Sequence, residues 1–350
     1  MSPLARGRAI AAAAIFLTVV VATATYLMLP PPSLDRSSSA SVLVIASDGS
    51  ILRGFLTGDG KWRLPVEPDM VDALYRRMLI AAEDGRFAWH PGVDPIAAAR
   101  AVAQLATHGH VVSGASTLTM QAVRLLERRP RSVTAKLNEM ADALALERRM
   151  SKAQVLGLYL TLAPFGGNLE GVRAASLAYF GKEPTRLSAA ECALLVAIPR
   201  SPERLRPDRH PAAARAARDR VLVRMAEQAV ISPAALAEAR EERIPPLRQA
   251  MRFRAPHLAR ELREEAPATL IHRTTIEPLL QQRVEALLKR EVLALDPEAT
   301  FAAIVVDSRD RRVLAYVGNA DFDAVARRGT LDMARAVRSP GSAMRWILTG

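Results

Sequence analysis

The sequence is poor in the residue types that build disulfides and metal centres. It contains a single cysteine, Cys192, so no disulfide can form within the chain. Cys192 lies in the apolar stretch ECALLVAIP, where a small core residue is expected. The six histidines are scattered, and no cluster of Cys and His has the spacing of metal ligands. We find no internal repeat and no low-complexity tract, and 350 residues suffice for one large or two modest globular domains.

Negative charge is in the minority, with 36 Asp and Glu against 48 Lys and Arg, which gives a formal net charge of +12. In a soluble protein this balance would suggest nucleic acid as a partner, whereas beside a membrane it suits anionic lipids or phosphate-bearing substrates. The membrane setting is expected here. Residues 9–29, AIAAAAIFLTVVVATATYLML, form an uncharged run of 21 residues. As a helix this run is about 30 Å long, the thickness of one bilayer core.

Residues 9–29 predict a single transmembrane helix, preceded by a cytoplasmic tail at 1–8. A cleavable signal peptide is the alternative, because ATA at 22–24 resembles a cleavage site, although the apolar core of a signal peptide usually has only about 7 to 15 residues. In both cases Arg6 and Arg8 hold the N-terminus in the cytoplasm. The rest of the chain is then expected on the periplasmic side of a bacterial inner membrane.

Beyond the apolar run, a linker, a hairpin and a helical body follow one another. Residues 30–40 are rich in Pro and Ser and predict a linker, and SVLVIASDGSILRGF at 41–55 reads as two strands joined at Asp48 and Gly49. In residues 70–82 apolar side chains recur at the spacing of a core-facing helix. Further helices are expected in five ranges: 94–106, 115–127, 132–160, 188–197 and 211–228.

Past the helical body the chain changes character. Residues 242–256 break the helical pattern with adjacent prolines and predict a second linker. FAAIVVDSRDRRVLAYVG at 301–318 gives two β-rich runs across a polar turn. We therefore expect one domain at 41–241 and a separate segment at 257–350.

Two adjacent carboxylates, Glu83 and Asp84, close the helix predicted at 70–82. At the C-terminal end of a helix, the dipole and apolar neighbours such as Leu79 both disfavour an ionised carboxylate, so we expect the pKa of Glu83 to be raised. Such a group can accept a proton near neutral pH, and general-base catalysis contributes on the order of 100- to 10,000-fold in rate. The alternative is a solvated helix end without a catalytic role.

Three further stretches carry polar or glycine-rich patterns. GASTLTMQAVRLL at 114–126 offers backbone N–H groups and hydroxyls to an anion, unless it is an ordinary capped helix. In TAKLNEMADALALERRMSK, Lys136 and Glu139 share a helical face and could hold a metal or phosphate, unless they are a solvated surface pair. Glycines within LYLTLAPFGGNLEGVRAASLAYFGK, 158–182, indicate a sharp, functional loop.

Together these stretches resemble the ordered motifs of the family 51 peptidoglycan glycosyltransferases. The match runs from about residue 41 to about residue 230, in order and at family spacing. It is carried by EDGRFAWHPG, GASTLTMQ, the 136–182 run and LSAAECALLVAIPRSPERLRPDRHP. WRLP, APFGG and RSPGS further resemble class A penicillin-binding proteins of the 1C type, in which a transpeptidase follows the glycosyltransferase.

The resemblance implies a mainly α protein. It implies a lysozyme-like glycosyltransferase domain with a membrane-embedded subdomain, placed after one N-terminal transmembrane helix, and a short α/β stub of a transpeptidase domain. The implied activity is polymerisation of lipid II into β-1,4 glycan strands with release of undecaprenyl pyrophosphate. The implied partners are lipid II, the nascent glycan strand, membrane lipid and other cell-wall synthesis proteins, with no nucleic acid and no organic cofactor.

The resemblance also implies roles for individual residues. By position, Glu83 would be the general base that takes the proton from the GlcNAc 4-hydroxyl of the acceptor, whose oxygen attacks the anomeric carbon of the donor MurNAc with inversion. Glu139 matches the second acidic position and would be the second catalytic residue, with Lys136 and Lys152 as pyrophosphate contacts. The cations, with Mg²⁺ or Mn²⁺, would offset charge on the leaving group. The full set of substrate-binding positions is Asp84, Phe87, His90, Ser116, Thr117, Gln121, Arg124, Lys136, Lys152 and Lys182.

Two positions depart from the family pattern, and three other functions compete with it. Many members have Arg where Ala135 stands and Gln where Met120 stands, and Ala135 removes one possible phosphate contact.

A lytic transglycosylase or lysozyme would cleave glycan instead. An inactive membrane-anchored scaffold would be the remnant of a bifunctional synthase. Nucleic-acid binding would use the Arg-rich stretch 200–224.

The last stretch, RSPGSAMRWILTG at 338–350, resembles the S-x-x-K motif of a penicillin-binding transpeptidase. Ser342 occupies the nucleophile position, but Arg345 replaces the lysine. A guanidinium stays charged at physiological pH and cannot take the serine proton. Because no S-D-N or K-T-G element follows, we expect a vestigial transpeptidase stub without activity.

Overall fold

The computed structural model describes residues 26–108, 116–127, 129–130 and 132–337. Its contacts divide the chain into two compact units. The first comprises the residues up to Ala40 together with Thr57–Gln249, and the second comprises Ser41–Leu56 together with the residues from Ala250 onward.

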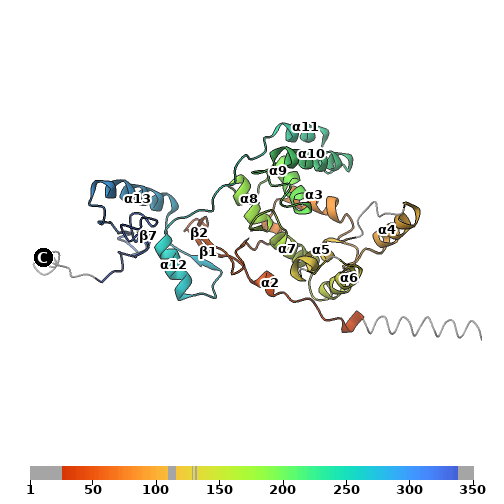
Figure 1. Ribbon diagram of the computed structural model, residues 1–350, viewed down its shortest axis with the longest axis horizontal. Coiled ribbons are helices and arrows are strands. Elements are labelled where there is room, and N and C mark those ends of the chain that lie inside the picture. The colour runs from red at the N-terminus through yellow and green to blue at the C-terminus, as the bar shows by residue number, and fades with distance from the viewer. Residues whose placement is uncertain (1–25, 109–115, 128, 131, 338–350) are drawn as a thin grey trace, which may run out of the picture. The chain divides into compact units, whose positions relative to one another are not determined.

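The first unit is built almost entirely of helices (Figure 1). Two short strands, β3 (Trp62–Arg63) and β4 (Leu169–Glu170), pair in parallel. The 3-10 helix η2 (Ile198–Arg200) follows α9 directly. The α-helices are α2 (Asp35–Ser38), α3 (Ala73–Glu83), α4 (Pro95–His108), α5 (Leu118–Glu127), α6 (Val133–Glu147), α7 (Lys152–Leu162), α8 (Val172–Phe180), α9 (Ala189–Ala197), α10 (Pro211–Glu227) and α11 (Pro233–Glu241).

Helix α9 lies at the centre of this unit and packs against α3 and α10. Its sequence is apolar on nearly every side, and Ser188 and Glu191 start it with a reciprocal capping box. Cys192 is completely buried in it, as expected, and burial raises the pKa of its thiol. Helix α3 presents the stripe Tyr75, Met78 and Leu79 to this core, which fixes the position of its last residue, Glu83.

The prediction of a single helix at 132–160 is wrong, because the structure contains two helices there. Helix α6 ends at Glu147 and α7 begins at Lys152. Ser151 accepts a hydrogen bond from the backbone N–H of Gln154, and the Gln154 side chain accepts one from the Ser151 N–H. This capping box satisfies N–H groups that a continuous helix would bond internally, so it starts a new helix.

The stretch 30–40, expected as a linker, is held firmly against the first unit. Its central part is helix α2, and the Arg36 guanidinium forms an ion pair with Glu170 at 2.6 Å and donates to the carbonyl of Leu125, in the last turn of α5. The buried Arg63 reaches the same Glu170 at 2.7 Å and donates to the carbonyl of Ser39. We name this docked segment, residues 33–39, the strap.

The second unit contains the predicted hairpin. Strands β1 (Val42–Ile45) and β2 (Ile51–Phe55) pair antiparallel, and β1 also pairs in parallel with β5 (Ile271–Arg273). Helices α12 (Pro256–Glu265) and α13 (Pro278–Glu291) and a second antiparallel pair, β6 (Ala303–Val306) and β7 (Val313–Val317), complete it. Its buried core consists of Val44, Ala46, Leu52, Ala259, Ile276 and Tyr316.

A boundary between the units does fall before residue 41, but residues 41–56 lie in the second unit and not in the helical one. The pairing of β1 with β5 joins them to the C-terminal segment. Such a pairing between distant strands leaves no local signal in the sequence.

Among the described residues, no helix combines the length and apolar character needed to span a bilayer. The predicted transmembrane helix at 9–29 and the tail at 1–8 fall mainly on residues outside the described ranges.

Candidate active site

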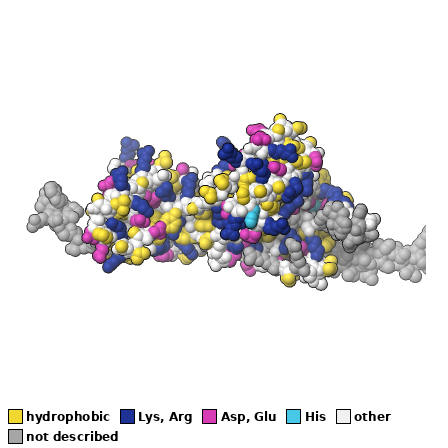
Figure 2. Space-filling view, turned by 45° about the horizontal axis from the view of Figure 1, so that its top comes forward, with side chains coloured by type: hydrophobic (Ala, Val, Ile, Leu, Met, Phe, Trp, Pro, Cys, Tyr) yellow, Lys and Arg dark blue, Asp and Glu magenta, His cyan; other side chains and the backbone are white. Residues whose placement is uncertain are grey.

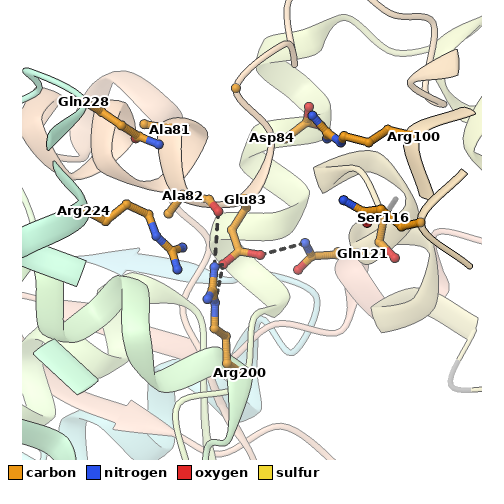
Figure 3. A pocket seen from close by; sticks show the side chains of 12 residues that line it. Ala81, Ala82, Glu83, Asp84, Arg100, Ser116, Gln121, Arg200, Arg224 and Gln228 are labelled. Carbon is orange, nitrogen blue, oxygen red and sulfur yellow. Dashed lines mark hydrogen bonds and ion pairs between the residues drawn. The ribbon is translucent and has the colours of Figure 1, made fainter. Parts of the chain in front are cut away.

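A cavity of about 800 Å³ opens at the C-terminal end of α3 in the first unit (Figure 3). Four of the predicted site residues line it: Glu83, Asp84, Ser116 and Gln121. The remaining lining residues are Ala81, Ala82, Gly85, Arg100, Gln104, Arg200, Arg224 and Gln228. We name this space the catalytic cavity.

Glu83, the last residue of α3, has a partner on each carboxylate oxygen (Figure 3). Arg200 forms an ion pair with Oε1 at 2.7 Å, and the Gln121 amide donates to Oε2 at 3.1 Å. Arg200 also donates to the carbonyl of Ala82 at 3.2 Å. A guanidinium is therefore in direct contact with the Glu83 carboxylate.

Arg200 is the residue that sequence reasoning missed. It lies at the end of η2, and its stretch, VAIPRSPERL, was matched to the family as a whole without a residue being singled out. Arg200 is one of several arginines in this part of the sequence, so its residue type alone does not mark it as a site residue. Its position directly after the apolar run of α9, where the chain must turn at the edge of the core, is the signal that could have marked it.

Asp84 has a buried carboxylate whose oxygens are occupied by donors from within the protein. His90 Nε2 lies 3.0 Å and 3.1 Å from its two oxygens, and the backbone N–H of Leu118 donates to Oδ2 at 2.9 Å. The Gly92 N–H donates to His90 Nδ1 at 3.2 Å, so Nε2 carries the imidazole proton and donates it to Asp84. These bonds join the loop after α3 to the start of α5.

Phe87 and Lys152 lie on the other side of that loop. The Phe87 ring is buried and packs edge-on against His90, with ring centroids 6.4 Å apart. The Lys152 ammonium lies 4.5 Å from the Phe87 ring centroid, 2.6 Å from the His90 carbonyl and 2.7 Å from Glu147. The structure thus places both residues as supports of the loop, and neither lines the catalytic cavity.

Thr117 caps α5 and lines a small recess of about 180 Å³ that shares Glu83, Asp84 and Ser116 with the catalytic cavity. Its hydroxyl accepts from the Met120 N–H at 3.1 Å and donates to the carbonyl of Gly92 at 2.6 Å. Lys182 forms an ion pair with Glu191 at 2.8 Å, at the start of α9. It is not among the residues that line the catalytic cavity.

A second charged cluster adjoins the cavity through Ser116. The buried Glu139 lies 3.2 Å from the Lys136 ammonium and 4.0 Å from Arg124 Nε. Lys136 also donates to the Ser116 hydroxyl at 2.6 Å, and Ser116 lines the cavity. The predicted helical pairing of Lys136 and Glu139 is confirmed, and it brings an ammonium to the cavity wall.

Residues 48–226 match the sequence model of the family described as Transglycosylase. The chain belongs to the transglycosylase family.

Comparison with individual transglycosylase relatives points to one type. The chain is 43% identical over 339 residues to penicillin-binding protein 1C of Escherichia coli, covering 97% of this chain and 44% of that protein. It is 32% identical to penicillin-binding protein 1A of Pseudomonas aeruginosa, over 71% of this chain and 30% of that protein. With penicillin-binding protein 1A of Mycobacterium tuberculosis it shares 31% identity, over 96% of this chain and 43% of that protein. The expected resemblance to the 1C type is confirmed, and the chain spans less than half the length of each relative.

The described residues of this transglycosylase chain form no ready-made set of metal ligands. Within the described ranges, no three His, Cys, Asp or Glu side chains group so that they could hold an ion. Both candidate acids face cations instead, Glu83 facing Arg200 and Glu139 facing Lys136. The divalent cation stays a prediction.

The two residues of the degenerate transpeptidase motif, Ser342 and Arg345, lie outside the described residues. The prediction that rests on them, a stub without acylation activity, stays a prediction.

Proposed function

We propose that this chain is a peptidoglycan glycosyltransferase that polymerises lipid II into β-1,4 glycan strands and releases undecaprenyl pyrophosphate. One observation carries the proposal: Glu83 is held at the end of a helix inside a cavity of about 800 Å³ that is also lined by Arg100, Arg200 and Arg224. A fixed carboxylate beside several cations suits a reaction that removes a proton from a hydroxyl and expels a phosphate-bearing group. The family match supports the same assignment.

In this reaction the 4-hydroxyl oxygen of the acceptor GlcNAc bonds to the anomeric carbon of the donor MurNAc, and its proton passes to Glu83. The bond between that carbon and the pyrophosphate oxygen breaks, and its electron pair leaves with the pyrophosphate, with inversion at the carbon. Gln121 and Arg200 hold the carboxylate in one orientation, while its further lone pairs are available to the hydroxyl proton. Negative charge grows on the leaving group, where the arginines of the cavity would stabilise it.

Glu139 is proposed to position cations and not to carry a proton. Its carboxylate lies between Lys136 and Arg124, which would otherwise repel each other. With Glu139 in place, Lys136 is held at Ser116 on the cavity wall. A phosphate in the cavity would then meet an ammonium that is already oriented.

The experiment is a gel assay of glycan products from labelled lipid II, made with the full chain in detergent. Glu83→Gln is expected to lower turnover at least about 100-fold, because an amide cannot accept the hydroxyl proton. Glu238→Gln, an exposed carboxylate on α11, is the matched control and is expected to keep full turnover. Glu139→Gln and Lys136→Ala are expected to lower turnover without lowering the melting temperature.

Three outcomes of this assay would contradict the proposal. A Glu83→Gln variant that keeps most of its turnover would remove Glu83 as the base. A wild-type chain that melts cooperatively but makes no polymer would favour the inactive scaffold. Cleavage of preformed glycan by the wild type would favour a lytic transglycosylase.

We also propose that the chain is anchored in the bacterial inner membrane by residues 9–29, with a lysozyme-like helical unit on the periplasmic side. Support comes from apolar side chains that the first unit leaves in solvent. Trp89 is 87% exposed, and Ile96, Val133 and Leu137 are also exposed. Exposed aromatic and aliphatic side chains beside many cations suit contact with an anionic bilayer.

A further inference from the structure

A second hollow, of about 430 Å³, lies between the chain that follows α9 and helix α10. We name it the arginine groove. Its floor is apolar and its rim is cationic. It is lined by Ala197, Arg200, Ser201, Arg204, Leu205, Ala213, Ala216, Ala217, Arg220, Val221 and Arg224. The lining thus holds four arginines, and no acidic side chain appears among the described residues that form it.

Three of these arginines have no counter-ion in the described part of the chain. Arg204, Arg220 and Arg224 are exposed, and within the described ranges none of them is paired with an acidic side chain. Two neighbouring arginines differ from them. Arg206 and Arg218 are buried and form ion pairs with adjacent aspartates, at 2.6 Å and 2.8 Å. The aspartates of this region are therefore paired with the buried arginines, and the positive charge of the groove remains available to a ligand.

The arginine groove continues the catalytic cavity, because Arg200 and Arg224 line both. Figure 2 shows Lys and Arg side chains spread widely over the visible face of the first unit. A ligand that fills the groove would reach into the cavity. It would be elongated, would carry more than one negative charge and would place small apolar groups on the alanine floor.

We propose that the arginine groove binds the carboxylates of the peptide that is attached to the sugar chain of the substrate. The proposal rests on the proposed function. A peptide with free carboxylates and small side chains matches the cationic rim and the alanine floor, and its attachment to a muramyl sugar explains why the groove opens from the cavity. Arg204 and Arg220 line the groove but not the catalytic cavity. They would therefore contact the peptide and not the groups that react in the cavity.

The test compares two forms of lipid II, one with free peptide carboxylates and one with the same carboxylates converted to amides. The variants are Arg204→Gln, Arg220→Gln and the double variant. Arg215→Gln is the control, since Arg215 is exposed on the same helix and lines neither hollow. The double variant is expected to raise KM for free-carboxylate lipid II about 3- to 10-fold, because each exposed contact is weak, and to leave kcat unchanged. For the amidated substrate the variants and the wild type should share one KM.

The substrate also carries negative charge on its phosphates. Comparing free-carboxylate lipid II with amidated lipid II separates binding of the peptide from binding of the phosphates. An equal rise in KM for both substrates would assign the groove to phosphate and overturn the proposal, as would an unchanged KM for both. If the wild type does not polymerise lipid II, the proposed function fails, and calorimetric titration with a soluble muramyl peptide then tests the groove alone. Binding by the wild type that weakens on amidation of the peptide and in the double variant supports the proposal, and equal binding overturns it.

Discussion

Replacing Asp84 by Ala is expected to lower the unfolding free energy of the first unit, and this loss of stability is its main effect rather than a loss of turnover. The Asp84 carboxylate accepts from His90 Nε2 at 3.0 Å and from the Leu118 N–H at 2.9 Å, and Asp84 and His90 are both buried. Removing it leaves two buried donors without an acceptor, at a cost of about 1–3 kcal/mol each. The expected loss of unfolding free energy is therefore about 2–6 kcal/mol. For a unit of this size each kcal/mol lowers Tm by roughly 2–4 °C, so the drop should be at least about 4 °C.

The assay is thermal unfolding of the full chain in detergent, followed by circular dichroism, with lipid II polymerisation measured well below every midpoint. Asp84→Asn keeps one carbonyl acceptor and should fall between the wild type and Asp84→Ala. Asp69→Ala, an exposed carboxylate of the same unit, should leave Tm unchanged. A wild-type Tm combined with a 100-fold loss of turnover would refute the reasoning. Asp84 would then be the substrate-binding residue that the sequence indicated.

Two further predictions concern the membrane and pH. The chain should stay with membranes through high-salt and alkaline washing, because an inserted apolar run resists both, and a mature N-terminus near Thr25 found by mass spectrometry would show signal cleavage instead. Hydrogen bonds from the Arg206 side chain hold the pKa of Asp208 below its usual value, so Asp208 stabilises the fold above its unfolded pKa of about 3.9 and loses this effect as pH falls through its folded pKa. The Tm difference between the wild type and Asp208→Asn should therefore be largest near neutral pH and shrink towards about pH 3, whereas a constant difference would exclude this linkage.

Periodicity located several elements of the fold because their apolar stripes face a core. The helix expected at 70–82 corresponds to α3, and the strands expected at 41–55 pair as a hairpin. The end of α6 at Glu147 leaves no sequence signal, because helix-favouring residue types continue through the turn at 148–150. The capping box of Ser151 and Gln154 then starts α7. The sequence predicts a linker at 30–40 because Pro and Ser indicate local flexibility, whereas a long-range ion pair such as that of Arg36 with Glu170 leaves no local signal.

The candidate site could be predicted in part for a similar reason. Motif resemblance named both Glu83 and Gln121 as site residues, and the structure shows that both line the catalytic cavity and are hydrogen-bonded to each other. Motif resemblance could not separate residues that face the cavity from residues that support the loop after α3, because a matched position does not say where its side chain points. Lys152 is an example, since its ammonium donates to the His90 carbonyl in that loop. Arg200 lies 117 residues after Glu83, and no spacing rule joins two positions so far apart.

The strap has a mechanical consequence if residues 9–29 anchor the chain as predicted. Arg148 donates to the carbonyls of Tyr26 and Leu29, at the end of the predicted anchor, and Arg36 donates to the carbonyl of Leu125 in the last turn of α5. The chain that leaves the anchor is thus fastened to the first unit at two successive points. A pull on the anchor would reach Arg148 first and Arg36 next, and Arg36 contacts α5, the helix that presents Gln121 to Glu83.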